Sequence, residues 1–442
     1  MAENDVLYDV VVIGGGPAGM LAAGRAASKG ARVLLVEKNT TLGQKLLITG
    51  GGRCNLTNAQ PDEKVFLGKF GKDAKFLFSA FSQFGVPETL EFFHKRHLYT
   101  KIEGENRVFP VTEQAQSVLD VLLRYMEHYD VSIRTNTPVS AFEIEDGKVV
   151  GVHAGQGAKK KLIRAHAFIV ACGGTSHPET GSTGDGFDWM RSIGHVIADS
   201  DPALVPVKIK GRFVKKLSGL SLPEAKLTLP MADQKPFSQS GKFLFTHFGI
   251  SGPLVLNMSK RIGEQLKYGE VTLSLDWMPH MDHGTVDRHI QGIFAIHQNK
   301  QIKNIIGQLV PPKMESVLLS LAEIDPDKEI NKVTHEERIS IVKILKGMEL
   351  HVQGLLSPDK AIVASGGVSL KEIDFKTMES RLHANVFVVG DMLNIERPSG
   401  GYSLQLCWTT GFVAGTHAAK IGKQITNDKL ASDKRNRASQ RV

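Results

Sequence analysis

The pattern Gly14-x-Gly16-x-x-Gly19 restricts the fold of this chain more than any other feature of its sequence. It follows the run Leu7–Ile13, whose β-branched residues are typical of a short buried strand, and it opens the alanine-rich segment Pro17–Lys29, which has the composition of a helix. In such a pattern the first glycine forms a tight turn, the second lets a pyrophosphate approach the backbone, and the third lets the helix pack closely on the strand. The sequence therefore predicts the start of a Rossmann-type dinucleotide-binding domain.

An acidic residue closes the second predicted strand, Arg32–Val36. Glu37 lies 18 residues after Gly19, where a carboxylate accepts hydrogen bonds from a ribose diol and repels a 2′-phosphate. The glycine pattern and the acid together predict dinucleotide binding, and they leave NAD and FAD as alternatives.

A segment near the C-terminus favours FAD. Val386–Val389 is a predicted buried strand that ends in Gly390-Asp391, where a carboxylate can reach the ribityl or phosphate hydroxyls of an extended FAD. Gly400-Gly401 then open a helix whose positive end suits the N1/C2=O edge of a flavin, where negative charge gathers on reduction. A simple nicotinamide dehydrogenase needs no second cofactor-binding segment near its C-terminus. We therefore expect one FAD held by both ends of the chain.

A second glycine loop, Gly50–Gly52, precedes Arg53, Cys54 and Asn55. Arg53 can neutralise a phosphate and Asn55 can hydrogen-bond a ring edge, but a plain surface loop is an equal alternative. Cys54 fits a small packing residue better than a nucleophile. Lys45 is either a phosphate contact or a solvated side chain.

The catalytic acid or base is not apparent from the sequence. His247 ends an apolar stretch and is a weak candidate for a proton donor at the substrate, although a structural histidine is the favoured interpretation. Cys54, Cys172 and Cys407 are far apart and form no CxxC pair, which argues against a disulfide framework, a zinc site and a redox dithiol. We therefore predict no metal site.

The periodicity of the chain indicates a split domain with two inserts. Alternating residues such as Val205, Val207 and Ile209 predict antiparallel sheet, whereas Thr334 and Glu337 form a capping box before a helix. These patterns predict a split α/β core domain that carries an antiparallel β insert followed by a helical insert. We expect five segments: FAD-binding domain, first part, 1–204; inserted β domain, 205–280; inserted helical domain, 281–350; FAD-binding domain, second part, 351–421; basic flexible tail, 422–442.

Charge and hydropathy restrict the partners. The net charge is +8, and the last fourteen residues contribute +4 of it, so the remainder is too small to predict a nucleic-acid groove. No long apolar run predicts a membrane span, and no targeting segment is recognisable, so we expect a cytoplasmic protein. A small-molecule substrate is the expected partner, and the oligomeric state is open.

With these motifs assembled, the chain resembles the bacterial BaiN/YhiN-like flavoproteins, which are described as NAD(P)/FAD-dependent oxidoreductases or aminoacetone-oxidase-like FAD-binding enzymes. The resemblance runs from about Tyr8 to Lys420, and its most specific motif is TGGGRCNLTN at Thr49–Asn58. Further shared segments are Gly43-Gln44-Lys45, Arg107–Pro110, Gly173-Gly174-Thr175, Thr180–Gly186, Pro202–Pro206, Leu244–Pro253, Gly366–Val368 and Gly401–Gln405.

The resemblance implies an α/β fold in which a Rossmann-type FAD-binding domain, like that of glutathione reductase, carries an inserted antiparallel β-barrel and a small helical domain. It implies FAD contacts at Gly14, Gly16, Ala18, Gly19, Glu37, Lys38, Arg53, Cys54, Asn55, Gly390, Asp391, Tyr402, Ser403 and Gln405. The motifs quoted above add Pro17, Lys45, Gly173 and Gly401 to the predicted cofactor set. One departure is Asp391, because the family tends to have Gly-Glu where this chain has Gly-Asp, and the aspartate has a shorter arm.

The leading hypothesis is an FAD-dependent oxidoreductase that acts on a small organic substrate. Hydride would pass through flavin N5, with NAD(P)H or oxygen as the other partner. Only one dinucleotide pattern is present, so a dedicated NAD(P)H domain is not predicted. Two alternatives are an FAD-containing RNA-modification factor and a flavin-binding protein without turnover.

Overall fold

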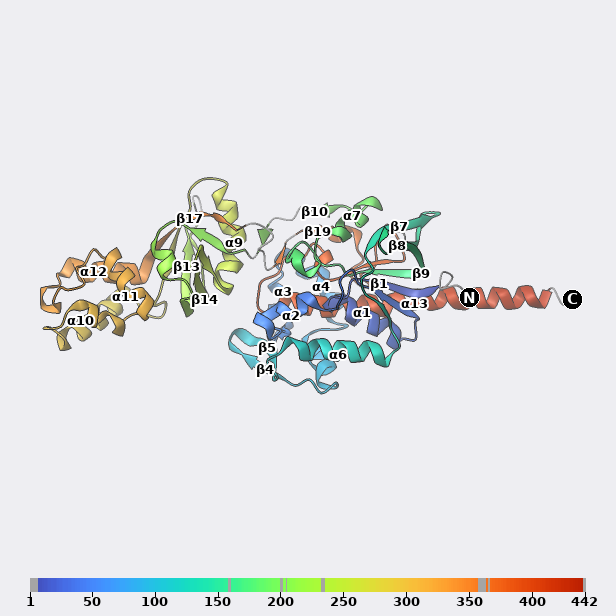
Figure 1. Ribbon diagram of the computed structural model, residues 1–442, viewed down its shortest axis with the longest axis horizontal. Helices are drawn as coiled ribbons and strands as arrows, with labels where there is room; N and C mark the ends of the chain where they lie inside the picture. Colours follow the sequence, from blue (N-terminus) through green and yellow to red (C-terminus); the bar gives the residue numbers. More distant parts are fainter. Residues whose placement is uncertain are drawn as a thin grey trace. The chain divides into compact units, whose positions relative to one another are not determined.

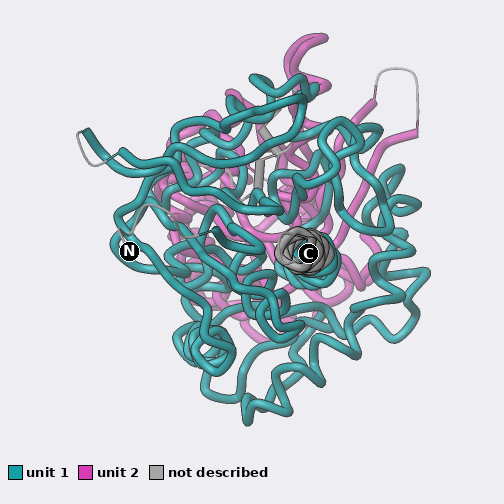
Figure 2. Tube along the Cα trace, turned by 90° about the vertical axis from the view of Figure 1, so that its right-hand side faces the viewer, with its two compact units in different colours: residues 1–201, 364–442 teal, residues 202–363 magenta. Residues whose placement is uncertain are grey.

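The computed structural model describes residues 7–157, 160–198, 202–203, 205–231, 235–356, 363–364 and 366–439 (Figure 1). The chain forms two compact units (Figure 2). Unit 1 comprises Met1–Asp201 and Ala364–Val442, and unit 2 comprises Pro202–Val363. Each unit has its own hydrophobic core.

A seven-stranded sheet forms the centre of unit 1, in the order β6-β2-β1-β9-β8-β7 with β20 paired to β9. Its core strands are β1 (Tyr8–Ile13), β2 (Val33–Val36), β6 (Ser132–Arg134), β9 (Lys161–Val170) and β20 (Val386–Val388), all parallel to their neighbours in this group. The antiparallel hairpin β7 (Val139–Glu145) and β8 (Lys148–Ala154) extends the sheet.

The register places the ends of the central strands at one edge of the sheet. Ile13 of β1 is aligned with Val36 of β2 and with Val170 of β9, and Val388 of β20 is aligned with Val170 as well. The segments that follow these strands therefore leave the sheet side by side, which is where ligands bind in open parallel sheets. Glu37 and Gly390 belong to these segments.

Two helices from opposite ends of the chain pack against each other. These are α1 (Pro17–Ser28) and α13 (Tyr402–Ser439). A Cβ added to Gly411 would lie 2.5 Å from the Ala18 carbonyl oxygen, and one added to Gly415 would lie 2.4 Å from the Ala22 carbonyl oxygen. The helices can approach this closely only because α13 presents glycine at both contacts.

Shorter elements surround this frame in unit 1. They are α2 (Gln44–Ile48), α3 (Glu63–Gly68), α4 (Ala74–Phe81), α5 (Val86–His94), α6 (Ala115–His128), α7 (Asp185–Ser192), β10 (Ile197–Ala198), β19 (Gly367–Val368) and the small sheet of β3 (Thr57–Asn58), β5 (Arg107–Pro110) and β4 (Thr100–Glu103).

Unit 2 contains a closed antiparallel barrel in the order β12-β15-β14-β13-β16-β17. Its strands are β12 (Val207–Ile209), β13 (Ser221–Leu229), β14 (Phe237–Thr246), β15 (Gly249–Ser251), β16 (Thr272–Asp276) and β17 (Met348–Leu355). The helices of this unit are α8 (Phe213–Lys216), α9 (Pro253–Leu266), α10 (His283–Ile296), α11 (Pro312–Leu321) and α12 (His335–Gly347). The barrel and the inserted helices confirm the predicted fold class.

The structure departs from the predicted boundaries in two places. Strand β17 closes the barrel and continues to Leu355, across the boundary expected between 350 and 351, and the inserted helices share one core with the barrel. Helix α13 runs to Ser439, past the boundary predicted between 421 and 422, and the flexibility of this segment stays a prediction. No glycine or proline follows Gly422, so nothing in the sequence stops the helix there. Among the helices that the structure describes, none is both long and apolar enough to cross a membrane.

Candidate functional site

The three glycines of the first motif have different surroundings. Gly14 has φ +107°, and a Cβ there would lie 2.6 Å from the Ala171 carbonyl oxygen. A Cβ on Gly19 would lie 1.9 Å from the Gly14 carbonyl oxygen, whereas one on Gly16 would meet no atom within 4 Å. Gly14 and Gly19 are therefore needed for packing, and Gly16 leaves open space at the first turn of α1. Pro17 follows at the first helical position and needs no N–H partner there.

The carboxylate of Glu37 lies beside this turn. Its Oε2 accepts a hydrogen bond from the Gly15 N–H at 2.7 Å, and its Oε1 accepts one from the Asn39 N–H at 2.8 Å. The side chain is 9% exposed, and each oxygen keeps a second lone pair. A buried carboxylate aimed by two backbone donors, next to open space at a helix N-terminus, fits the ribose and pyrophosphate of a dinucleotide.

The loop before α7 lies against the residues that follow Glu37. Lys38 Nζ donates to the Thr183 hydroxyl at 2.5 Å and to Asp185 Oδ2 at 2.8 Å. Asn39 donates to the Thr180 carbonyl oxygen at 3.0 Å. Lys38 is thus engaged by protein groups beside the Glu37 carboxylate.

The C-terminal segment reaches the N-terminus of α1. A Cβ on Gly390 would lie 3.1 Å from Ala18 Cβ, and Gly390 has φ +61°. On its other side, a Cβ on Gly174 would lie 3.4 Å from the Asp391 carbonyl oxygen. The glycine motif, the end of β9 and the end of β20 therefore meet in unit 1, although nearly 400 residues separate the first from the last.

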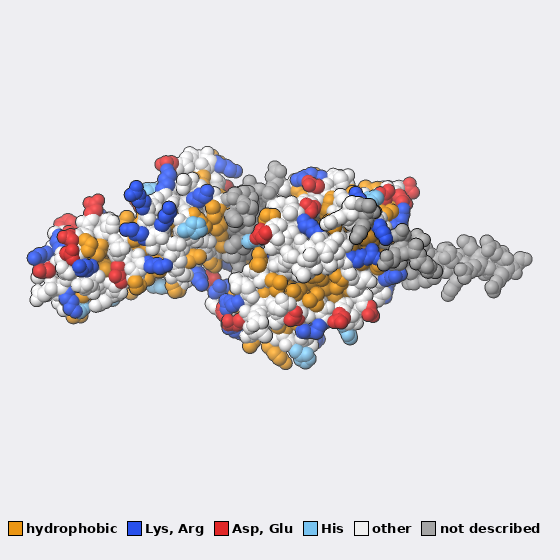
Figure 3. Space-filling view, in the orientation of Figure 1, with side chains coloured by type: hydrophobic (Ala, Val, Ile, Leu, Met, Phe, Trp, Pro, Cys, Tyr) orange, Lys and Arg blue, Asp and Glu red, His pale blue; other side chains and the backbone are white. Residues whose placement is uncertain are grey.

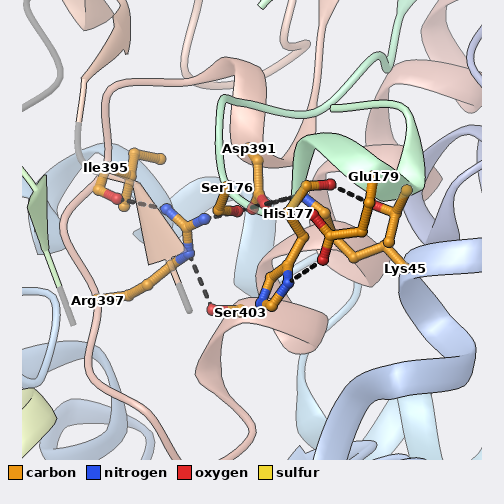
Figure 4. A network of polar contacts seen from close by, with 9 residues as sticks. Lys45, Ser176, His177, Glu179, Asp391, Ile395, Arg397 and Ser403 are labelled. Carbon is orange, nitrogen blue, oxygen red and sulfur yellow. Dashed lines mark hydrogen bonds and ion pairs between the residues drawn. The ribbon is translucent and has the colours of Figure 1, made fainter. Parts of the chain in front are cut away.

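A polar network surrounds Asp391 (Figure 4). Arg397 forms an ion pair with Asp391 Oδ1, and it donates to the Ser403 hydroxyl at 3.1 Å and to the Ile395 carbonyl oxygen at 2.7 Å. Lys45 Nζ lies 4.0 Å from Asp391 Oδ2, which is too far for a hydrogen bond. Oδ2 therefore keeps capacity to accept a ligand hydroxyl.

Lys45 enters this network from α2. Its amino group donates to the Ser176 hydroxyl at 3.1 Å, and a Cβ on Gly173 would lie 3.8 Å from Lys45 Nζ. Burial lowers the pKa of Lys45, while the nearby Asp391 opposes that shift. The predicted residues Lys45, Gly173 and Asp391 are thus brought together.

Arg397 is the site residue that the sequence analysis missed. It is 7% exposed and holds three partners of different kinds. The available signal was a basic residue six positions after Asp391 in an otherwise uncharged stretch broken only by Glu396. A buried arginine needs a carboxylate, and Asp391 supplies it.

The start of α13 is tied to the small sheet. With its side-chain amide turned over, which satisfies both of its polar atoms, Asn55 donates to the Thr57 carbonyl oxygen at 3.2 Å and accepts from the Gly401 N–H at 3.0 Å. A Cβ on Gly401 would lie 2.3 Å from the Thr57 carbonyl oxygen, so glycine is required there by packing. The Tyr402 ring packs on Phe66 with centroids 4.7 Å apart. These contacts fix the position of the helix N-terminus.

Two residues predicted to contact the cofactor have fully buried side chains. Cys54 and Gln405 are 0% exposed, and their predicted cofactor contacts stay predictions. Gln405 accepts from the Thr57 hydroxyl at 2.6 Å and donates to the hydroxyls of Thr89 and Thr409. Burial raises the pKa of Cys54 to about 12, which keeps the thiol protonated. Both residues support the site from within the core.

Arg53 is directed to a protein carboxylate. Its guanidinium forms two hydrogen bonds to Glu103, at 2.9 and 3.1 Å, and lies 4.0 Å from the centre of the Phe109 ring. The Glu103 partner raises the pKa of Arg53. Its predicted contact with a cofactor phosphate stays a prediction.

His247 belongs to unit 2. It is exposed in the turn between β14 and β15, with its ring edge-on to Phe248 at 4.9 Å between centroids. A catalytic role for His247 stays a prediction. Among the described residues, no group of His, Cys, Asp and Glu could hold a metal ion.

Known proteins resemble this chain over nearly its whole length. The family model described as HI0933-like protein Rossmann domain matches residues 8–417. A 3-dehydro-bile acid delta(4,6)-reductase from Clostridium scindens is 33% identical over 416 residues, covering 92% of this chain and 98% of the relative. A ribosomal RNA dihydrouridine synthase from Escherichia coli K12 is 25% identical over 406 residues, covering 92% of this chain and 96% of the relative.

A solved structure shares the fold. The 3-ketosteroid delta1-dehydrogenase from Sterolibacterium denitrificans aligns with a TM-score of 0.53 at 15% identity, covering 94% of this chain and 99% of that one. The family match and the glycine–carboxylate geometry agree with each other. The chain belongs to the HI0933-like Rossmann family, and it is an oxidoreductase with a Rossmann-type FAD-binding domain.

Proposed function

We propose that this protein binds one extended FAD across unit 1 and reduces a carbon–carbon double bond conjugated to a carbonyl group. The observation that carries the proposal is the approach of Gly390 to Ala18, at 3.1 Å from an added Cβ, which joins the Gly-Asp segment to the open turn at Gly16. We place the reaction in the cytoplasm and take NAD(P)H as the source of hydride.

Different residues would bind different parts of the cofactor. The α1 N-terminus with Gly16 receives the pyrophosphate, Glu37 accepts from the ribose, and Asp391 Oδ2 accepts from a ribityl hydroxyl while Arg397 holds Oδ1. The N-terminus of α13 presents positive potential, which suits a flavin edge that becomes negative. FAD, when bound, supplies hydride transfer through its N5 atom.

The names of two relatives support the class of substrate. A 3-dehydro-bile acid with 4,6 double bonds carries C=C conjugated to a ketone, and the C5=C6 bond of uridine is conjugated to the C4 carbonyl. In uridine, hydride would go to C6, β to the C4 carbonyl, and a proton to C5. In a 4,6-dienone, hydride would go to the β or the δ carbon and the proton to the adjacent carbon on the carbonyl side. The balanced reaction joins NAD(P)H, a proton and the unsaturated carbonyl compound to give NAD(P)⁺ and the saturated compound.

An anaerobic spectrum tests this proposal. The protein is reconstituted with FAD, reduced with NADPH or NADH, and mixed with a 3-oxo-4-ene steroid acid, with uridine or with aminoacetone. We expect bleaching of the flavin by a nicotinamide and its recovery with a conjugated carbonyl compound. Reduction of the oxidised flavin by aminoacetone, with no recovery by any conjugated compound, would instead identify an amine oxidase.

RNA is a second candidate substrate, because its uridine residues contain a C=C bond conjugated to a carbonyl group. The Escherichia coli relative named as a ribosomal RNA dihydrouridine synthase supports this candidate. The distribution of charge along the chain also supports it, because residues 205–267 contain eleven Lys or Arg and three Asp or Glu.

A further inference from the structure

The polar network around Asp391 contains more positive than negative charge. Arg397 pairs with Asp391 Oδ1, and Lys45 lies on the other side of the same carboxylate, with its Nζ 4.0 Å from Oδ2 (Figure 4). The Arg397 side chain is 2% exposed, and those of Lys45 and Asp391 are 20% and 19% exposed. In the part of the chain that the structure describes, two largely buried cations therefore share one largely buried carboxylate.

A second carboxylate nearby does not balance Lys45. The side chain of Glu179 is 64% exposed, and its Oε1 lies 2.8 Å from His177 Nδ1. Asp391 raises the pKa of Lys45 more than Glu179 does, but burial lowers this pKa by more than either carboxylate raises it. The amino group donates to the hydroxyl of Ser176, which carries no charge. The network thus keeps an excess of positive charge at Lys45.

A buried lysine of unit 2 has the opposite surroundings. The side chain of Lys346 is 6% exposed, and its Nζ forms an ion pair with Asp276 Oδ2 at 2.6 Å and donates to the Met278 carbonyl oxygen at 2.8 Å. Other Lys and Arg side chains lie at the surface of both units, where water solvates their charge (Figure 3). Burying a cation without a close anion is unfavourable, so the excess charge at Lys45 suits a ligand that brings negative charge.

The excess charge lies near the start of α13. Arg397 donates to the hydroxyl of Ser403, which is in the first turn of that helix. Asp391 is the proposed partner of the ribityl chain, and this chain joins the pyrophosphate of FAD to the flavin ring. The pyrophosphate has a separate proposed site at the N-terminus of α1, where Gly16 leaves open space. These positions favour the flavin side of the cofactor for Lys45 over the pyrophosphate.

We propose that the ammonium group of Lys45 stabilises the negative charge that bound FAD gains on reduction, and so raises the reduction potential of the cofactor. The inference rests on the proposed function, because it requires FAD at Asp391. Hydride from NAD(P)H adds two electrons and one proton to FAD, so the ring gains one negative charge. A cation near the ring then binds reduced FAD more tightly than oxidised FAD, and the ratio of the two affinities sets the shift in potential.

Neutral variants of Lys45 test this role in the FAD-loaded full chain. The potential is measured by equilibration with a redox dye, and the affinity for oxidised FAD by fluorescence titration. We expect K45M to bind reduced FAD about tenfold to hundredfold less tightly, relative to oxidised FAD, which lowers the potential by about 30 to 60 mV. K45Q, which is neutral but keeps a donor for Ser176, should show the same fall, and K45R should restore the potential.

K346M is the matched control, because it neutralises a buried lysine that has a close carboxylate. Its potential should equal that of wild type. In urea unfolding of the cofactor-free proteins, K346M should lower the midpoint, since it leaves Asp276 without its cation. K45M removes a charge that has no close anion, so its midpoint should fall by less than half as much or should rise.

The outcomes separate this inference from its alternatives. The pyrophosphate has the same charge in both redox states, so an equal loss of affinity for oxidised and reduced FAD in K45M would assign Lys45 to the pyrophosphate and overturn the inference. A potential that K45M and K45Q leave unchanged, or a urea midpoint that falls in K45M by half as much as in K346M or more, would overturn it too.

These measurements use no unsaturated substrate, so they can fail independently of the proposed reaction. If a steroid enone reoxidises the wild-type flavin but the potential ignores Lys45, the reductase function stands and the role of Lys45 is wrong. If the potential falls in K45M but no conjugated carbonyl compound reoxidises the flavin, the role of Lys45 stands and the proposed reaction fails. If the wild-type protein takes up no FAD, both are wrong.

Discussion

Single residues decide whether the first turn of α1 can receive a cofactor. Gly16 has an extended backbone that any residue can adopt, with open space where a Cβ would stand. Gly19 has no such space, because the Gly14 carbonyl oxygen occupies it. Two glycines of one motif therefore differ, because Gly16 leaves open space at the helix N-terminus and Gly19 is required for packing.

Gly16→Val is expected to block binding without unfolding the protein. Its side chain would occupy the space proposed for the pyrophosphate, so FAD affinity should fall by about a hundredfold, or about 2.7 kcal/mol. The unfolding free energy of the apo protein should change by less than about 0.5 kcal/mol. Gly19→Val, as the matched variant, should lower stability by about 3 kcal/mol. Flavin fluorescence titration and urea unfolding measure both, and unaltered FAD affinity in Gly16→Val would contradict the site.

Asp391 also has a structural task that can be measured without cofactor. Asp391→Asn leaves the buried Arg397 guanidinium without its anion, and breaking such a pair costs about 3 kcal/mol. Asp188→Asn makes the same change in an exposed pair with Arg191 and should cost less than about 1 kcal/mol. Equal stability of the two variants in urea would show that the Arg397 pair is not a buried one.

A buried histidine gives unit 1 a dependence on pH. His195 Nδ1 lies 2.9 Å from Glu372, and its Nε2 lies 2.8 Å from the hydroxyl of Ser380. That hydroxyl also accepts hydrogen bonds from two backbone N–H groups, so the three side chains link separate segments of unit 1. The Ser380 hydroxyl is buried and is not an exposed nucleophile. Burial lowers the pKa of His195, although Glu372 opposes the shift.

The sign of the effect follows from that pKa. Because the unfolded chain takes up the proton first, the stabilising contribution of neutral His195 is present above about pH 6.5 and is lost as the pH falls through the lower folded pKa. We expect urea unfolding between pH 7 and 5 to show a flatter profile for His195→Gln than for wild type. The exposed His128→Gln should keep the wild-type slope, and an unchanged slope in His195→Gln would refute the assignment.

At the scale of elements, the close packing of α1 on α13 joins the two ends of the chain. Gly411 and Gly415 lie one helical turn apart and face α1. This contact holds the N-terminus of α13 near the glycine motif, so it is a structural condition for a shared cofactor site.

Gly415→Ala tests that contact. The added methyl would press on the Ala22 carbonyl oxygen, so we expect a loss of about 1 to 3 kcal/mol although alanine is the better helix former. Gly68→Ala, at the end of α3, has no atom within 4 Å of the new Cβ and should be neutral or slightly stabilising. Thermal unfolding measures both, and the reverse order would exclude tight helix packing.

At the scale of the whole molecule, local motifs could be predicted and distant partnerships could not. The glycine turn and the acid after β2 are set by neighbours in sequence, and the structure has them. Gln405 was predicted as a cofactor contact, but its partners Thr57 and Thr89 lie more than 300 residues away. Its burial depends on how distant segments pack, which no local pattern reports.

The charged segments show the same limit. The sequence analysis ascribed half of the net charge to the last fourteen residues and predicted no nucleic-acid groove, whereas residues 205–267 alone carry a net charge of +8. In the barrel, Lys226 and Lys242 occupy the neighbouring strands β13 and β14, while Lys208 lies on β12, three strands from β13. Arg397 was missed although its partners Asp391, Ser403 and Ile395 lie within six residues, because no local pattern shows that its own side chain is buried.

Hydrogen–deuterium exchange with and without FAD tests the shared cofactor site most directly. We predict that a single saturating titration of the apo protein protects peptides containing Gly14–Gly19 and peptides containing Gly390–Gln405 together, with one stoichiometry and one midpoint. Peptides of the barrel should be unaffected. Protection confined to one of the two segments, or different midpoints for the two, would contradict the conclusion that both ends of the chain hold the same FAD.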